Sequence, residues 1–173
     1  MNPPSPQQLL ESSRSLGRQL LAAGLTIATA ESCTGGLLAS TLTDIEGSSD
    51  YVLGGVISYS NEVKQNLLGV RPSTLAQHGA VSPETAGEMA RGVRRLLASD
   101  LAVAVTGIAG PGGGSPDKPV GLVYLHLSAS GAELSRREVW PYDRTGNKRS
   151  TVESALSLVL QYLQRNADRS WGT

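Results

Sequence analysis

The sequence has one cysteine, no phenylalanine and no excess of charge of either sign. A single cysteine cannot form an intramolecular disulfide. Lysine plus arginine and aspartate plus glutamate both number 15, which argues against the basic surface of a nucleic-acid or anionic-membrane binder. Aromatic residues make up only 4%, too few for a platform that stacks single-stranded nucleic acid. We therefore expect neither nucleic acid nor a membrane as a partner.

Long hydrophobic runs and targeting signals are also missing. Even SALSLVLQYLQ (154–164) is interrupted by polar residues and is too short to cross a bilayer. The start MNPPSPQQLL lacks the basic and apolar blocks of a signal peptide, which predicts a cytoplasmic protein. The length of 173 residues suits one domain with a substantial core, so we predict a single domain over 1–173.

What is present is an alternation of helical patterns and short apolar strands. The predicted order is a helix from Pro6 to Gly24, a strand at 25–30, a helix over 35–43, a strand at 54–59, a helix over 62–69, a helix from Pro83, a strand at 101–107, two antiparallel strands joined around Gly131, and a last helix from about Asn147 to Gln164. The continuously apolar LAVAVTG (101–107) is typical of a parallel strand covered on both faces. The sequence therefore predicts an α/β fold, a three-layer α/β/α sandwich with a mixed, mostly parallel sheet.

Three of the predicted strands end in unusual sequence. These stretches are ESCTGG (31–36), YSNEVK (59–64) and TGIAGPGGG (106–114). Ligands of open α/β sheets bind beyond the carboxyl ends of parallel strands, where helix N-termini and loops collect. If these strands are parallel neighbours, the three stretches meet at one edge and form a functional site.

The stretch ESCTGG has two interpretations. Gly35 and Gly36 permit positive φ or close approach of a ligand, and free N–H groups at a helix start favour an anion or oxyanion. Ser32 directly precedes them and is a candidate nucleophile. Alternatively, Ser32 or Thr34 caps the helix and Glu31 complements the helix dipole. The stretch by itself leaves both interpretations open.

The stretch YSNEVK adds a candidate base. Lys64 falls in the first turn of a helix, where the macrodipole disfavours an ammonium. A lysine held there and partly desolvated would have a lowered pKa and could accept the proton of a serine. Tyr59, at the strand end, could relay a proton or orient the lysine. The alternatives are a solvated surface lysine and a core tyrosine with its hydroxyl at the surface.

The glycine-rich segment GIAGPGGGSPDKP (107–119) is not a P-loop. Counted from Gly112, the position that should be glycine is Asp117, and the position that should be serine or threonine is Pro119. Its successive N–H groups can still form an anion nest, and a flexible surface loop is the alternative.

The sequence gives little support for a metal site or for a cysteine nucleophile. His78 and His126 are isolated, without the spacing of a zinc site, so we predict no metal and no cofactor. Ser32 is not in a G-x-S-x-G elbow, which disfavours a Ser-His-Asp hydrolase. Cys33 could be a nucleophile beside Glu31 and Lys64, or only a small buried apolar residue.

Four motifs, in this order, closely resemble the CinA C-terminal family: TIATAESCTGGLLASTLTDIEGSSDYVLGGVISYSNEVKQNLLGV, HGAVSPETAGEMA, AVAVTGIAGPGGGSPDKPVGLVY and DRTGNKR. The resemblance covers almost the whole chain. It implies an α/β/α fold that commonly self-associates, so we expect a homo-oligomer. It also implies hydrolysis of the carboxamide of nicotinamide mononucleotide (NMN) to nicotinic acid mononucleotide and ammonia, a recycling step of pyridine-nucleotide metabolism, by a metal-independent Ser/Lys mechanism.

The resemblance also implies roles for individual residues. Ser32 matches the nucleophile, Lys64 the base, and Tyr59 the tyrosine of the same motif, while Ser48 of GSSDY is a second candidate nucleophile. The implied substrate-binding residues come from the helix start, the glycine loop and the later arginine motif: Glu31, Thr34, Gly35, Gly36, Ser48, Thr106, Gly107, Ala109, Gly110, Gly112, Arg144 and Arg149. The two arginines suit a substrate phosphate.

Two alternatives to this function stay open. One is a non-catalytic nucleotide-binding module, in which Ser32 only caps a helix. The other is an amidase that uses Cys33. Many relatives carry a second, N-terminal domain, and we expect any activity of that domain to be absent here.

Overall fold

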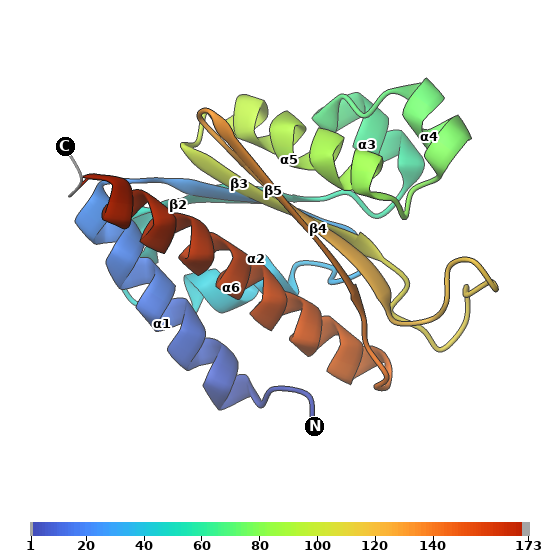
Figure 1. The fold of residues 1–173 in the computed structure, drawn as a ribbon, viewed down its shortest axis with the longest axis horizontal. Helices are drawn as coiled ribbons and strands as arrows, with labels where there is room; N and C mark the ends of the chain where they lie inside the picture. Colours follow the sequence, from blue (N-terminus) through green and yellow to red (C-terminus); the bar gives the residue numbers. More distant parts are fainter. Residues whose placement is uncertain (1, 171–173) are drawn as a thin grey trace.

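The computed structural model describes residues 2–170 and shows an α/β sandwich (Figure 1). The elements, in chain order, are α1 (Pro6–Ala23), β1 (Ile27–Glu31), α2 (Leu37–Thr43), the 3-10 helix η1 (Ser48–Asp50), β2 (Val52–Ile57), α3 (Asn61–Leu68), α4 (Pro72–His78), α5 (Pro83–Leu97), β3 (Leu101–Gly107), β4 (Leu122–Ala129), β5 (Ala132–Val139) and α6 (Arg144–Ser170). Within residues 2–170, no helix is both long and apolar enough to cross a membrane.

The sheet is mixed, as the sequence predicts. Its five strands lie in the order β2-β1-β3-β4-β5. Strand β1 pairs in parallel with both β2 and β3, whereas β4 runs antiparallel to β3 and β5. The carboxyl ends of β1, β2 and β3 are therefore neighbours at one edge, and the prediction that the three polar stretches follow adjacent strands is confirmed.

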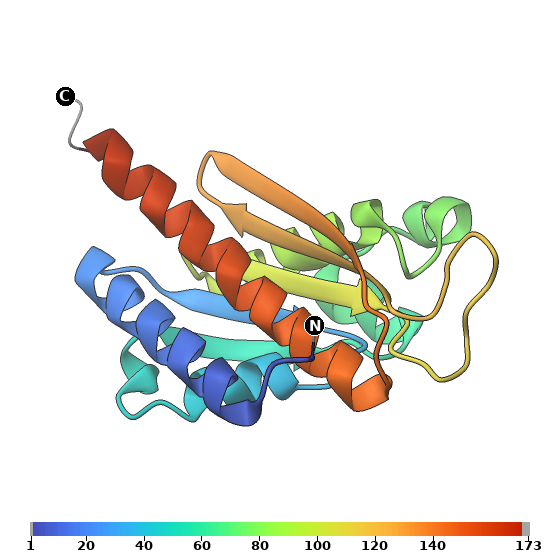
Figure 2. The same cartoon turned by 60° about the horizontal axis from the view of Figure 1, so that its bottom comes forward.

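Helices cover both faces of this sheet. Helices α1, α2 and α6 pack together on one face, and α3, α4 and α5 gather on the other (Figures 1 and 2). Alternate residues of each strand face opposite layers. Ala28, Ala30, Ala102 and Ala104 pack with Met89 and Val93 of α5, whereas larger aliphatic side chains of the same strands pack under α1 and α6. The small alanine side chains allow α5 to lie close to the sheet.

The helix boundaries follow local signals in the sequence. Ser5 caps α1, which ends at Gly24 in the left-handed conformation, and Ser60 caps α3, which ends at Gly69 in the same conformation. The sequence did not predict α4, a short helix that starts at a proline and lacks a long apolar stripe.

The predicted start of the last helix is three residues late. Helix α6 begins at Arg144, not at Asn147. The Asp143 side chain accepts a hydrogen bond from the Gly146 N–H, and its carbonyl oxygen accepts one from the Asn147 N–H. Asp143 therefore caps the helix, and the residues of the arginine motif that follow it form the first helical turn.

Candidate active site

A cleft of about 280 Å³ opens at the carboxyl ends of β1, β2 and β3. The structure brings together, in the lining of this cleft, most of the residues that the sequence analysis selected: Ser32, Tyr59, Lys64, Thr106, Gly107, Ala109, Gly110, Gly112 and Arg144. We call it the Ser32 cleft.

The centre of the cleft is a hydrogen-bonded pair of Ser32 and Lys64. Lys64 is the fourth residue of α3, and its side chain runs back toward the helix N-terminus, as helical side chains do. The residue is only 1% exposed. Its Nζ atom lies 3.1 Å from Ser32 Oγ, 2.6 Å from the Ser58 carbonyl oxygen and 3.5 Å from that of Tyr59.

Lys64 is buried without a negative partner. Within residues 2–166, no carboxylate forms an ion pair with it. Burial lowers the pKa of Lys64 below its ordinary value of 10.5, and only the nearby Cys33 thiol opposes that effect. A neutral amine has two N–H donors and one lone pair. The two carbonyl oxygens can take the donors, which leaves the lone pair for the hydroxyl proton of Ser32.

Glu31 caps the helix that follows it, a role that the sequence analysis gave to Ser32 or Thr34. Its carboxylate accepts hydrogen bonds from the backbone N–H groups of Gly36 (3.1 Å), Leu38 (3.0 Å) and Ala39 (2.8 Å). Glu31 therefore caps α2, and neither Ser32 nor Thr34 does. This carboxylate is buried and does not line the Ser32 cleft, unlike the position expected of a substrate-binding residue, and the Ser32 hydroxyl is not used as a helix cap.

The helix start leaves two N–H groups for an oxyanion. The Gly35 N–H donates to the Ser32 carbonyl oxygen (3.1 Å), and the Gly36 N–H donates to Glu31. Within the part of the chain that the structure describes, the N–H groups of Cys33 and Thr34 donate to no other residue, although that of Cys33 interacts with its own thiol. Of the predicted anion site over Thr34 to Gly36, the Gly35 and Gly36 N–H groups are therefore already engaged within the protein.

Cys33 lines the cleft but is a poor nucleophile. The residue is 6% exposed, and burial, aided by the charge of Glu31, raises the pKa of its thiol to about 12. The Cys33 backbone N–H and the charges of Lys64 and Lys148 lower this pKa and only partly offset the rise. A thiol with that pKa is neutral at physiological pH, so the geometry disfavours the Cys33 alternative.

Arg144 and Tyr59 meet at the mouth of the cleft. The Arg144 guanidinium donates to the Gly110 carbonyl oxygen (2.7 Å) and to the Tyr59 hydroxyl (3.1 Å). Tyr59 is 62% exposed, and its backbone carbonyl, not its hydroxyl, faces Lys64. The Tyr59 hydroxyl therefore contacts Arg144 and not Lys64, whereas the sequence analysis expected it to relay a proton or orient the lysine.

Ser48 and Arg149 lie outside the cleft. Ser48 precedes β2 at the opposite edge of the sheet, where its hydroxyl donates to the Thr43 carbonyl oxygen. Arg149 is five positions after Arg144 on α6, which turns it to another side of the helix, and it lines a separate pocket beside Leu9 and Leu37. The structure therefore does not bring Ser48 or Arg149 together with the Ser32–Lys64 pair, as the sequence analysis expected.

Several cleft residues carry no chemical signal in the sequence. Ala80, Val81, Ile108 and Gly113 line the cleft and were not predicted, because they offer only apolar surface and backbone. Asn147, within a predicted motif, holds the glycine loop by donating to the Ala109 carbonyl oxygen (3.1 Å).

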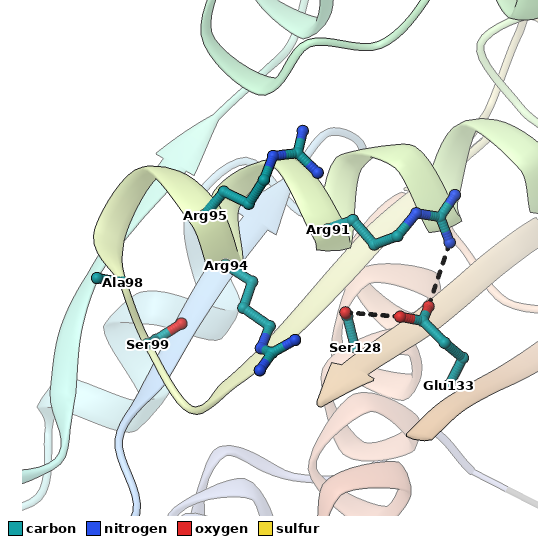
Figure 3. A pocket seen from close by; sticks show the side chains of 7 residues that line it. All are labelled: Arg91, Arg94, Arg95, Ala98, Ser99, Ser128 and Glu133. Atoms are coloured by element: carbon teal, nitrogen blue, oxygen red, sulfur yellow. Dashed lines mark hydrogen bonds and ion pairs between the residues drawn. The ribbon is translucent and has the colours of Figure 1, made fainter. Parts of the chain in front are cut away.

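A second and larger cavity lies near the amino end of β3. It has a volume of about 460 Å³ and is lined by Arg91, Arg94, Arg95, Ala98, Ser99, Ser128 and Glu133 (Figure 3). We call it the arginine cavity. Figure 3 shows Arg91 and Ser128 directed at the Glu133 carboxylate, at 3.2 Å and 2.8 Å. The Glu133 carboxylate is thus engaged by Arg91 and Ser128, and the Arg94 side chain donates to the Asp100 carbonyl oxygen (3.0 Å).

No metal cluster is apparent in the described part of the chain. Among those residues, no group of three or more His, Cys, Asp or Glu side chains is arranged to hold a metal ion.

The chain is similar to proteins of one family along most of its length. Residues 10–163 match the CinA C-terminal domain. A CinA-like protein of Desulforapulum autotrophicum is 52% identical over 145 residues, which cover 83% of this chain and 34% of the relative. A CinA-like protein of Leptospira borgpetersenii is 48% identical over 153 residues, which cover 88% and 37%. The chain thus spans about a third of the length of these curated relatives.

Solved structures of similar proteins share the whole fold. The competence/damage inducible protein CihA from Agrobacterium tumefaciens is 44% identical, with a TM-score of 0.87 over 93% of this chain and 97% of that one. A competence-damaged protein (CinA) superfamily protein from Escherichia coli is 31% identical, with a TM-score of 0.86 over 89% and 90%. The chain belongs to the CinA C-terminal domain family.

Proposed function

We propose that the chain is a nicotinamide-nucleotide amidohydrolase, which converts NMN and water to nicotinic acid mononucleotide and ammonia. The observation that carries the proposal is the buried Lys64 amine, 3.1 Å from Ser32 Oγ and without a counter-ion in the described chain. The motif resemblance supplies the substrate, and the geometry of the cleft supports the Ser/Lys chemistry.

The first half of the reaction is formation of an acyl-enzyme. Neutral Lys64 removes the Ser32 proton, and the serine oxygen attacks the carboxamide carbon of the substrate. The N–H groups of Cys33 and Thr34 stabilise the negative charge on the carboxamide oxygen. The Lys64 ammonium then gives its proton to the leaving nitrogen. The C–N bond breaks, ammonia departs, and an ester to Ser32 remains.

The second half is hydrolysis of that ester. Lys64, neutral again, takes a proton from water, and the resulting hydroxide attacks the ester carbon. Collapse of the second tetrahedral intermediate breaks the ester bond, and Lys64 returns the proton to the Ser32 oxygen. The products are the nicotinic acid mononucleotide and the free serine. Every step uses protein groups and water alone.

The remainder of the cleft would hold the nucleotide. Arg144 presents a guanidinium fork at the mouth, which suits a phosphate. The exposed Tyr59 ring beside it offers an apolar face, and the backbone from Gly107 to Gly113 offers N–H groups for ribose and phosphate.

The test is release of ammonia and nicotinic acid mononucleotide from NMN by the purified protein in the presence of a chelator. We expect turnover by the wild type and by Cys33→Ser, and none by a folded Ser32→Ala variant. Loss of activity in Cys33→Ser with retention in Ser32→Ala would select the cysteine amidase. Binding of NMN without release of ammonia would select the non-catalytic binding module.

A further inference from the structure

Side chains at the start of α5, in β3 and in the glycine loop hold the connection between α4 and α5. The carbonyl oxygens of four consecutive residues, 78–81, each accept a side-chain hydrogen bond. Ser82 and Thr85 donate to the Gly79 oxygen at 3.1 and 2.8 Å, and Thr106 donates to the Ala80 oxygen at 2.7 Å. Ala80 and Val81 form one wall of the Ser32 cleft. Polar contacts, rather than regular secondary structure, therefore hold this wall in place.

Lys118 supplies the two remaining bonds, from the far side of the glycine loop. Its Nζ atom donates to the carbonyl oxygens of His78 (2.7 Å) and Val81 (2.8 Å). The loop that carries it projects beyond the carboxyl end of β3, at the same end of the molecule as α4 (Figures 1 and 2). Lys118 thus connects two segments that both contribute residues to the lining of the cleft.

Local hydrogen bonds hold the backbone of the loop at Lys118. The Ser115 N–H donates to the Lys118 carbonyl oxygen (2.8 Å), and the Lys118 N–H donates to the Ser115 hydroxyl (3.1 Å). By contrast, residues 111–117 are all exposed and include three glycines, so the loop gains much conformational freedom when it is released. Within the described residues, Lys118 forms no ion pair, and its charge is directed entirely at the two carbonyl oxygens.

We propose that Lys118 is a positioning residue, which fixes the glycine loop against residues 78–81 and so sets the shape of the Ser32 cleft before a ligand enters. The inference rests on the proposed function for its link to catalysis. Lys118 does not line the cleft, so it acts through Val81 and the loop rather than on the substrate. Its loss should weaken substrate binding and leave the Ser32–Lys64 pair in place.

The test compares Lys118→Met, Lys118→Arg and the control Arg137→Met, an exposed arginine of β5 that does not line the cleft. We expect Lys118→Met to raise KM for NMN about tenfold, as for the loss of one strong hydrogen bond, with kcat changed less than about threefold. Hydrogen exchange in peptides covering 78–82 and 108–121 should become faster. Lys118→Arg, which keeps a charged donor, should restore both properties, and Arg137→Met should match the wild type.

The two readouts separate this inference from the proposed function. Faster exchange together with raised KM supports the positioning role. Wild-type exchange in Lys118→Met, or faster exchange with an unchanged KM, overturns it. If the wild type releases no ammonia from NMN, the proposed function fails, and exchange alone then decides whether Lys118 holds the two walls together.

Discussion

The Ser32 cleft and the arginine cavity lie near opposite ends of the sheet and differ in how their charges are satisfied. The arginine cavity is larger, and its Glu133 carboxylate accepts hydrogen bonds from Arg91 and Ser128 and contacts His126 closely. In the cleft, the buried amine of Lys64 has only carbonyl and hydroxyl oxygens for partners. Volume and charge density therefore do not distinguish the site that we propose to be reactive. An unpaired buried base beside a nucleophile does.

The same contrast is visible in the pKa shifts of the two sites. Burial lowers the pKa of Lys64, which makes the reactive neutral form accessible. Burial would raise the pKa of Glu133, but hydrogen bonds from His126 and Ser128 and the charges of His126 and Arg91 outweigh it, and the pKa falls below 4.5. One site makes a group reactive, and the other holds a group in its ordinary charged form.

The largest expected effect is the loss of either member of the catalytic pair. Lys64→Met should lower kcat for NMN by roughly 10⁴-fold or more, because the base is removed. The double variant Ser32→Ala/Lys64→Met should lose little more than either single variant, since the two residues act as a unit. Steady-state kinetics on folded proteins measures this. Ser48→Ala, at the opposite edge of the sheet, is the control and should keep near-full turnover; comparable loss in that variant would contradict the assignment.

A smaller effect is expected from an arginine in the cleft and none from an arginine in the arginine cavity. Arg144→Gln should raise KM for NMN roughly 10- to 100-fold, the effect of losing charge-assisted hydrogen bonds to a phosphate. Arg94→Gln should leave KM unchanged. Equal effects of the two substitutions would remove the distinction between the sites.

The buried lysine should also make stability depend on pH. An unfolded chain keeps the Lys64 proton up to about its ordinary pKa of 10.5, whereas the folded chain releases it earlier. Between those two pKa values the unfolded state binds more protons, so stability rises with pH, by at most about 1.4 kcal/mol per pH unit. Urea unfolding of wild type and Lys64→Met across this range should show their difference shifting in favour of the wild type as pH increases. Parallel curves would mean that Lys64 titrates normally.

The smallest expected effect concerns the arginine cavity. Glu133→Gln should lower the free energy of unfolding at neutral pH by about 0.5–1 kcal/mol, as for other partly exposed ion pairs, and leave turnover of NMN unchanged. The folded-state pKa of Glu133 is depressed, so its contribution is present above 4.5 and disappears as pH falls through the folded value. Urea unfolding at neutral and acid pH measures the difference. A loss of turnover would show that the cavity takes part in catalysis.

Local patterns predicted the framework of the site. Serine–proline pairs and glycines marked the ends of helices, and the apolar strands identified the sheet. The proximity of Ser32 and Lys64 followed because Ser32 comes directly after β1 and Lys64 lies in the first turn of the helix after β2, its parallel neighbour. Their catalytic roles remain a proposal, as does self-association of the chain.

Other features depended on geometry that no local pattern specifies. Arg144 lines the cleft and Arg149 does not. This difference depends on the residue at which α6 starts, because that residue sets the direction in which each side chain points. Lys118 bonds to the carbonyl oxygen of His78, 40 positions earlier in the chain, which only the folded loop brings together. The sequence does not show whether the Glu31 carboxylate caps a helix or binds a substrate, because the same side chain can do either.

The most direct test of the account is the protonation of Lys64 itself. The chain has only three lysines, at positions 64, 118 and 148, so selective ¹³C labelling of the lysine side chains gives a spectrum simple enough to assign. The resonance that disappears in Lys64→Met should titrate clearly below 10.5, and its midpoint should move in Ser32→Ala. If that resonance instead titrates at or above 10.5, Lys64 is an ordinary ammonium, and a Ser32–Lys64 mechanism is contradicted.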